Sequence, residues 1–403
     1  MNLARRARPW VLCGLAVTGV AVLAQSQGRI IDGTLAAKKV FADRQLAALA
    51  VPFTGVRTGA GVTPGLFPVH ATGVSTEPVR LAADAFLASL TSTQAIRTVF
   101  AVDDAEWRRW SNVDNGIYVR QGVSLKEMTE AQRQAAMALV RASLSAKGLA
   151  LTDAIRKTDQ TLSEINNDAV RYDEQLYFFT LMGVPSRTEP WGWQIDGHHL
   201  VINYFVLGDQ VVMTPVFMGG EPVVATTGKY AGNAVLQTEQ DAGLAFMRAL
   251  TAEQQGAATL RRDKTSNDIQ AEADSDNRVI DYRGLQAAVM SAPQKAQLRA
   301  LIALYVGNLR DDQAKIRMAD VEGRLGDTWF AWSGGTADAD VFYYRIHSPV
   351  MLIEFDHQMP VGTRVLNAVA RPTRAHIHVV VRTPNGNDYG KDLLRQHLAT
   401  HPH

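Results

Sequence analysis

Apolar positions at helical spacing and apolar runs of strand length follow each other twice along the chain. In each round the helical segments come first, and they begin at a Thr or Ser that stands three residues before a Gln. This is the capping-box pattern, in which the hydroxyl accepts a backbone N–H of the first turn and the Gln side chain reaches back to the cap. The expected helix starts are Thr91, Thr129, Thr251 and Ser291.

The apolar runs that follow are rich in Val, Ile, Tyr, Phe and Trp, which favour strands. Turn residues such as Gly219-Gly220 and Pro384-Asn385-Gly386 flank these runs. A group of helices followed by a group of strands is typical of the α+β class rather than of a doubly wound sheet. We therefore expect an α+β fold with the strands in its centre.

The two rounds also match each other at an offset of about 150 to 160 positions. The aligned pairs are 86–94 with 246–254, the segment from Gly122 with that from Gly284, the segment from Leu176 with that from Thr328, and the segment from Trp193 with that from Tyr344. This order predicts an internal duplication, with two similar halves over 81–235 and 236–403 packed about a pseudo-two-fold axis in one compact domain. A leading helix and a wrapping loop are expected over 25–80.

The N-terminus has the pattern of a secretory signal peptide over 1–24. The basic residues Arg5, Arg6 and Arg8 precede an apolar stretch from Trp10 to Ala24. We expect an exported protein, periplasmic or extracellular, with no membrane span in the mature chain. The chain's one cysteine, Cys13, would leave with the signal peptide. A metal would then be held by His, Asp, Glu or Asn, which favours zinc, copper, iron or manganese.

The charge of the chain is nearly balanced, with 41 basic and 40 acidic residues. No basic stripe interleaved with aromatic residues is present, so nucleic-acid binding is not expected. The most polar segment, 261–282, lies between the two predicted halves and is interpreted as a solvated surface connection.

The histidines supply the candidate chemistry. His376 and His378 lie in the apolar run AHIHVVVRT, and side chains alternate along a strand, so both project to one face. That spacing suits two ligands of one metal ion. The alternative is that hydrogen bonds to backbone or carboxylate groups satisfy both rings.

A second pair, His198 and His199, follows Gly197. Adjacent residues of a strand point to opposite faces, so one of the pair is expected in the site, with His199 ahead of His198. Asn203 shares the face of His199, and the alignment places it over Glu354. We expect these two positions to approach a common centre, with His199 and His357 near its ends.

Glu354 and Asp356 are candidate catalytic groups, as ligands, as partners of the imidazoles or as a general base. An ion pair with Arg345 or Arg382 is the structural alternative. The predicted substrate pocket contains aromatic, amide and charged side chains near the histidines in sequence. These residues are Trp191, Trp193, Asn203, Arg345, Arg382 and Asp388. For the two tryptophans core packing is the alternative, and for Asp388 it is a helix cap.

The phrases PWGWQIDGHHLVINY, YYRIHSPVMLIEFD and HIHVVVRTPNGNDYGKDLLRQH together resemble the bacterial family of unknown function DUF3500. The resemblance covers most of the predicted mature chain and implies a secreted protein of this size. It brings no activity and no catalytic residues. It also implies that the Gly-His-His and His-x-His phrases are kept in the family, whereas His357 varies.

Several familiar catalytic patterns are missing from the sequence. It has no His-Glu-x-x-His, no Gly-x-Ser-x-Gly, no phosphate-binding loop and no Gly-x-Gly-x-x-Gly after a strand. The leading hypothesis is a metal-dependent hydrolase that acts on a small or polymeric extracellular substrate. The alternatives are a copper or iron oxidoreductase, a non-enzymatic protein that binds a metal or small ligand, and a structural protein.

Overall fold

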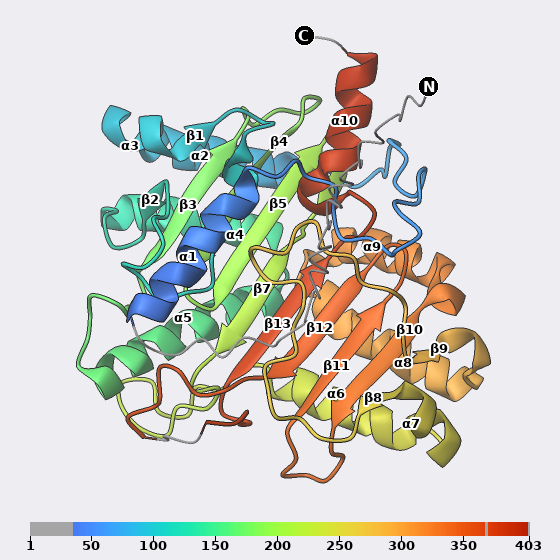
Figure 1. Cartoon of the computed structure of the whole chain (residues 1–403). Coiled ribbons are helices and arrows are strands. Elements are labelled where there is room, and N and C mark those ends of the chain that lie inside the picture. The colour runs from blue at the N-terminus through green and yellow to red at the C-terminus, as the bar shows by residue number, and fades with distance from the viewer. Residues whose placement is uncertain (1–34, 367–369, 402–403) are drawn as a thin grey trace, which may run out of the picture.

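The computed structural model describes residues 35–366 and 370–401. A 13-stranded mixed sheet crosses the molecule from edge to edge (Figure 1). Its main path runs β1 (Val99–Phe100), β3 (Tyr177–Met182), β4 (Trp191–Gly197), β5 (Leu200–Leu207), β7 (Val216–Gly220), β13 (Ile377–Arg382), β12 (Leu352–His357), β11 (Phe342–His347), β10 (Trp329–Gly334) and β8 (Thr259–Arg261). Off this path, β2 (Val123–Ser124), β6 (Gln210–Val212) and β9 (Leu285–Gln286) pair with β3, β5 and β10.

Ten α-helices are present among the described residues, which confirms the α+β class. They are α1 (Leu35–Leu49), α2 (Glu77–Ser89), α3 (Ser92–Thr98), α4 (Glu130–Ser143), α5 (Ala146–Asn166), α6 (Gln237–Ala249), α7 (Ala252–Ala258), α8 (Ala292–Val306), α9 (Asp311–Gly323) and α10 (Lys391–Thr400). Four short 3₁₀ helices are η1 (Ala105–Arg108), η2 (Ala287–Val289), η3 (Leu325–Asp327) and η4 (Asp388–Gly390).

The predicted capping boxes are all formed. Thr91, Thr129, Thr251 and Ser291 are the N-caps of α3, α4, α7 and α8, and each exchanges hydrogen bonds with the Gln three residues later. Two of these glutamines also form hydrogen bonds between neighbouring helices. Gln132 Nε2 donates to Gln94 Oε1 at 2.8 Å, and Gln294 Nε2 donates to Gln254 Oε1 at 2.7 Å. A hydrogen bond between two capping-box glutamines therefore connects α3 to α4, and an equivalent bond connects α7 to α8.

The sheet has the same strand order on both sides of its centre. On one side β1 is parallel to β3, and β3, β4, β5 and β7 follow as antiparallel neighbours. On the other side β8 is parallel to β10, and β10, β11, β12 and β13 follow. The two series meet where β7 pairs with β13 in the middle of the sheet.

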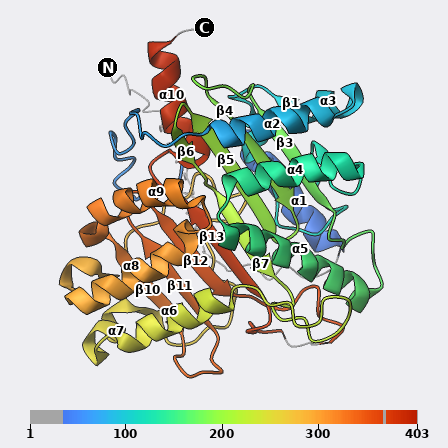
Figure 2. The same cartoon turned by 180° about the vertical axis from the view of Figure 1, so that it is seen from behind.

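The two faces of the sheet are covered differently. Helices α2, α4, α5, α6 and α8 lie over one face (Figure 2), and the main hydrophobic core lies beneath them. The other face is covered by α1 and by long loops (Figure 1), with smaller apolar clusters between. We call these the helix face and the loop face. The loop face carries the site described below.

The polar segment 261–282 does not form the expected solvated surface connection. It lies across the loop face, and Lys264, Ala271, Ala273 and Asp276 within it are buried. The reason is that buried strand residues supply partners for its polar groups. Its backbone N–H groups, for example, donate to carboxylates of β12.

Helix α1 and the irregular segment that follows it fall within the N-terminal region expected over 25–80. The predicted signal peptide, 1–24, lies outside the described residues. Within the described ranges, no helix combines the length and the apolar composition needed to cross a membrane.

Candidate metal site

Three of the predicted histidines meet at the ends of the central strands, on the loop face. His199 lies in the two-residue turn between β4 and β5, His376 directly precedes β13, and His378 is its second residue. Strand β7 lies between β5 and β13, with Gly219 opposite His378 in the register. The Gly219 N–H donates to the His199 carbonyl at 2.8 Å. Gly219 therefore separates the backbones that carry His199 and His378.

The imidazoles converge over this glycine. One ring nitrogen from each of His199, His376 and His378 lies within 4.8 Å of the other two, and all three residues are buried. The His199 ring centroid is 5.3 Å from that of His376 and 5.3 Å from that of His378. His199 has φ +61°, a left-handed conformation that histidine adopts more readily than most residues. The cluster has the residue types and the spacing of a metal site.

Gly219 provides the room for this approach. A Cβ atom at position 219 would lie 3.1 Å from His199 Cδ2 and 3.3 Å from His378 Cδ2. It would also lie 2.9 Å from the Ile377 carbonyl oxygen, which is backbone and does not move away freely. Glycine is therefore the only residue that leaves both rings in place without a shift.

The hydrogen bonds of His376 and His378 determine which ring nitrogens carry protons. His376 Nδ1 lies 2.6 Å from the Met359 carbonyl oxygen, which only accepts, so this nitrogen donates and Nε2 keeps its lone pair. His378 Nδ1 lies 2.8 Å from Glu272 Oε1, and an ionised Glu272 imposes the same state. The two Nε2 atoms are 2.9 Å apart. Two lone pairs then face each other, which is repulsive unless positive charge lies between them.

A cation bound to both Nε2 atoms removes this repulsion. Metal-bound histidines commonly donate their other ring N–H to a carboxylate or a backbone carbonyl, as both rings do here. With metal–nitrogen bonds of about 2.0–2.1 Å, nitrogens 2.9 Å apart subtend about 90° at the metal. A tetrahedral angle needs roughly 3.3 Å, so the pair fits after an opening of about 0.4 Å.

A proton on Glu272 is the other arrangement that satisfies these atoms. Burial, followed by the nearby carboxylates of Asp274 and Asp356, raises the pKa of Glu272 well above its usual value. A protonated Glu272 donates to His378 Nδ1, and His378 Nε2–H then donates to His376 Nε2. Burial lowers the pKa of both imidazoles, so neither takes up a second proton easily. The cluster thus accommodates either a metal ion or one extra proton.

His198, beside His199 in the same turn, belongs to a second group of interacting side chains. Its Nδ1 lies 2.6 Å from Asp159 Oδ1, and the Tyr177 hydroxyl donates to Asp159 Oδ2 at 2.7 Å. The rings of His198 and His199 stack at 3.8 Å, and Tyr172 packs on His198 at 5.5 Å. Helix α5 supplies Asp159, so a carboxylate from the helix face orients a ring at the ends of the central strands.

Glu221, directly after β7, holds the loop that leads to His376. Its carboxylate accepts hydrogen bonds from the N–H groups of Val361, Gly362 and Thr363, and from the Thr363 hydroxyl. Glu221 Oε2 is also 3.4 Å from His376 Nδ1. Although burial opposes it, the electrostatic interaction with the His376 ring and the hydrogen bonds from Thr363 and Gly362 lower the pKa of Glu221. This buried anion fixes both the loop and the His376 ring.

The structure does not bring His357 to the cluster. His357 lies on the helix face, where Nδ1 accepts the Phe342 N–H and Nε2 is 2.9 Å from Gln240 Oε1.

Trp191 and Trp193 also project to the helix face and lie in the main core. Trp193 stacks on Tyr204. These tryptophans are thus packed in the core and do not line a pocket with the histidines.

Glu354 and Asp356 lie on the loop face, as the histidines do, but they are engaged elsewhere. Glu354 accepts the Tyr343 hydroxyl at 2.6 Å and the N–H groups of Gln270 and Ala271. Asp356 is the register partner of His378, yet its carboxylate is paired with the buried Lys264 at 2.6 Å. Both carboxylates anchor segment 261–282 to the sheet.

Asn203 does not approach Glu354 at a common centre. Strands β7 and β13 separate β5 from β12, and each spacing is about 4.8 Å. Asn203 instead bonds the Gln194 side chain and the Pro215 carbonyl. The expected meeting of these two positions is wrong because β5 and β12 lie on opposite sides of the central β7–β13 pair.

The remaining predicted pocket residues hold loops. Arg345 donates to the Asp281 carbonyl. Arg382 is fully buried and pairs with Asp276 at 2.7 Å and with Asp388 at 3.1 Å. Asp388 is not the cap of α10, because Gly390 is the N-cap residue. It accepts the Thr383 N–H and closes the turn after β13.

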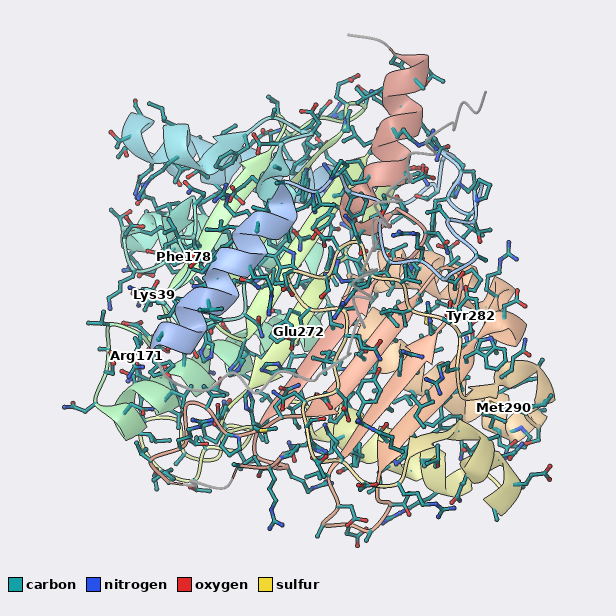
Figure 3. All side chains as sticks on the ribbon, viewed as in Figure 1. Lys39, Arg171, Phe178, Glu272, Tyr282 and Met290 are labelled. Atoms are coloured by element: carbon teal, nitrogen blue, oxygen red, sulfur yellow. The ribbon has the colours of Figure 1, made fainter. Side chains whose placement is uncertain are left out.

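Four residues around the histidines were not predicted from the sequence: Asp159, Gly219, Glu221 and Glu272. They come from three distant parts of the chain, since Gly219 and Glu221 are near neighbours, and three of the four are carboxylates that hold an imidazole or its loop. Figure 3 shows Glu272 over the central strands, on the side of the sheet that faces the viewer in Figure 1. A signal for Glu272 did exist, because Ala271 and Ala273 flank it with small apolar residues typical of a buried segment.

Comparison with known proteins gives one match. A family model described as a protein of unknown function, DUF3500, matches residues 72–391. This range includes every residue of the site described above. No curated protein and no solved structure matches the chain.

Proposed function

The chain belongs to the DUF3500 family, whose description assigns no activity, and we propose from the site that it binds one divalent metal ion through His199, His376 and His378. The facing Nε2 atoms of His376 and His378, 2.9 Å apart, carry this proposal. Neutral imidazoles suit zinc, copper and iron, among which the residues do not discriminate, whereas manganese prefers oxygen ligands.

We further propose that the metal serves hydrolysis. Three histidine ligands leave a position for water, and a bound zinc-type ion lowers the pKa of that water to about 7. His198 lies beside the proposed ligand His199, on which its ring stacks at 3.8 Å. Asp159 orients His198 through Nδ1, which leaves Nε2 to accept a proton from water or to return it to a leaving group.

A non-enzymatic metal-binding protein is the second candidate, and burial favours it. His199, His376 and His378 are 2%, 3% and 6% exposed, so little of the cluster is open to a large substrate. The more accessible side chains are His198 and Glu272, at 11% and 16% exposed. A site closed by protein ligands fits storage or structural binding better than turnover.

X-ray absorption spectroscopy of the metal-loaded protein separates the two candidates. Three nitrogen ligands with a water oxygen support hydrolysis, whereas a closed sphere of protein ligands supports binding alone. Activity is then screened with the metal found, on ester, amide and phosphoester substrates. A His198→Gln variant provides the control: it should keep the metal and lose turnover if His198 transfers the proton. A redox-active metal with an oxidase activity would support the oxidoreductase alternative instead.

We also propose that the two halves arose by duplication. The strand registers support this proposal, since Gln194 pairs with Asn203 in the first half and Arg345 pairs with Glu354 at the aligned positions of the second.

Export of the protein remains a proposal that rests on the N-terminal pattern. Sequencing the N-terminus of the protein recovered from the periplasm or medium tests it, and cleavage before Gln25 is expected.

A further inference from the structure

The helix face contains a cavity of about 90 Å³, separate from the histidine cluster. It lies at the centre of the sheet, beneath the β7 and β13 strands, where Val216 and Val381 are register partners. Leu309 also lines it, and Leu309 forms a bridge with Leu144 between the α8–α9 and α4–α5 connections. The cavity thus lies where the two halves of the molecule meet.

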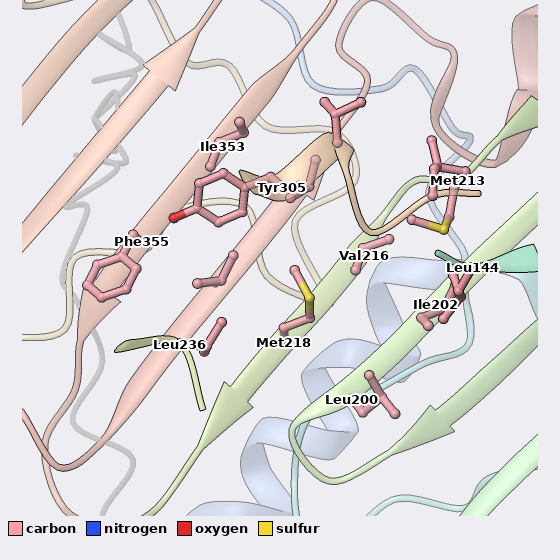
Figure 4. Close-up of a cluster of buried hydrophobic side chains, with 14 of the residues drawn as sticks. Leu144, Leu200, Ile202, Met213, Val216, Met218, Leu236, Tyr305, Ile353 and Phe355 are labelled. Carbon is pink, nitrogen blue, oxygen red and sulfur yellow. The ribbon is translucent and has the colours of Figure 1, made fainter. Parts of the chain in front are cut away.

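Most of the cavity wall is apolar. Met213, Val216 and Met218 line it from the first half, and Val306, Leu309 and Val381 line it from the second. Figure 4 shows Met213, Val216 and Met218 in one buried cluster with Tyr305. The exposed His70 and the half-exposed Asp320 also line the cavity, so it reaches the surface. A molecule from solution therefore has a route to these apolar walls.

Arg317, from α9, brings a positive charge to this wall. Its Nη2 donates to the Val350 carbonyl and to the Thr383 hydroxyl. The paired carboxylate, Asp320, is 3.5 Å from Nη1 and 50% exposed. Burial lowers the pKa of Arg317, so its surroundings do not fully compensate its charge. Asn308, also in the wall, has a buried Oδ1 without a hydrogen-bond partner among the described residues.

These features define the chemistry of a ligand. The Arg317 guanidinium has five N–H donors, of which Nη2 gives two to Val350 and Thr383, and the donors on Nε and Nη1 together with the positive charge suit a carboxylate. The apolar walls exclude a strongly hydrated anion and favour a hydrocarbon chain. A cavity of about 150 Å³ holds the six carbons of benzene, so 90 Å³ corresponds to a chain of about four carbons.

We propose that this cavity is a binding site for a short-chain carboxylate of about four carbons, with the carboxylate on Arg317 and the chain between Val216, Leu309 and Val381. The site is independent of the proposed metal chemistry. A linear or branched four-carbon acid satisfies the charge of Arg317 and fills the apolar space at once.

Isothermal titration of the metal-free protein with butyrate tests the proposal, because carboxylates would otherwise bind a metal at the histidines. We expect saturable binding of one butyrate per chain and a rise in Tm. Butyramide, which has the same size without the charge, should bind at least tenfold more weakly, and octanoate should not fit. Arg317→Gln should lose butyrate binding, whereas the exposed Arg395→Gln and the metal-site variant His378→Ala should keep it.

No butyrate binding, equal binding of butyramide, or equal binding by Arg317→Gln would overturn the proposal. If Arg317→Gln does not fold, the ligand series on the unaltered protein still decides. Loss of binding in His378→Ala would instead place the carboxylate at the histidine cluster.

Discussion

The Nε2 atoms of His376 and His378 lie 2.9 Å apart, while Nδ1 of each ring contacts an oxygen acceptor. Both rings are buried, and burial lowers the pKa of each. Positive charge between the two Nε2 atoms therefore stabilises the pair. Among the described residues, this charge can come only from a proton. A metal ion that binds there displaces this proton, so metal affinity should rise with pH.

Gly219→Ala should weaken metal binding at least tenfold. The added Cβ would contact His199 Cδ2, His378 Cδ2 and the Ile377 carbonyl oxygen, so the rings must separate. Titration of the metal-free protein with zinc measures the effect. Gly256→Ala is the matched control, because a Cβ at Gly256, in α7, meets nothing within 4 Å. Equal zinc affinity in both variants would show that the rings over Gly219 do not hold the metal.

Asp159→Asn should separate proton transfer from metal binding. Asp159 contacts His198, not the three proposed ligands, so metal content should stay near that of the unaltered protein. Turnover should fall about 10²–10⁴-fold, which is the usual contribution of a positioned acid or base. Steady-state kinetics on the substrate found by screening checks this. Unchanged turnover would remove His198 from the mechanism.

His347 should make the protein sensitive to acid. Burial, followed by the charge of Arg345, lowers its pKa to about 3, against about 6.5 when unfolded. The unfolded state therefore takes up a proton first as the pH falls from about 6.5 towards 3, and stability is lost in this window at about 1.4 kcal/mol per pH unit.

His347→Phe removes that proton uptake while keeping a ring against Tyr282. The free energy of unfolding, measured by urea denaturation at pH 7 and pH 5, should fall less in the variant than in the unaltered protein. An identical fall in both proteins would contradict a neutral buried His347.

Gln132→Leu and Gln294→Leu should destabilise the protein to a similar extent. Each glutamine completes the capping box of its own helix and bonds the glutamine of a neighbouring capping box. Loss of the cap and of one buried hydrogen bond costs about 2 kcal/mol in total. Chemical denaturation of the two variants checks this. A cost in one half alone would mean that the repeated contacts are not equivalent in energy.

The features that sequence could predict are local. The helix starts at Thr91, Thr129, Thr251 and Ser291 were predictable because a capping box involves only four consecutive residues. The shared face of His376 and His378 follows from the alternation of side chains along one strand. The same rule places His357 opposite Glu354 and Asp356, so alternation alone argued against one site for all three.

The features that sequence could not predict depend on contacts between distant segments. The pairing of β7 with β13 places Gly219 opposite His378, and nothing near either residue indicates that register. Asp159 reaches the site from a helix, and Glu272 reaches it from a segment whose charges suggested a solvated loop. Charge composition was misleading there because the buried strands offer hydrogen-bond partners for those charges.

Elemental analysis of the untagged protein is the most direct test of the metal proposal. We expect about one metal ion per chain in the unaltered protein, and at least a tenfold lower content in His376→Ala and His378→Ala. His357→Gln, which alters a buried histidine on the opposite face, should keep the metal. Absence of metal that added zinc, copper, iron or manganese does not restore, or equal metal content in all variants, would contradict the account.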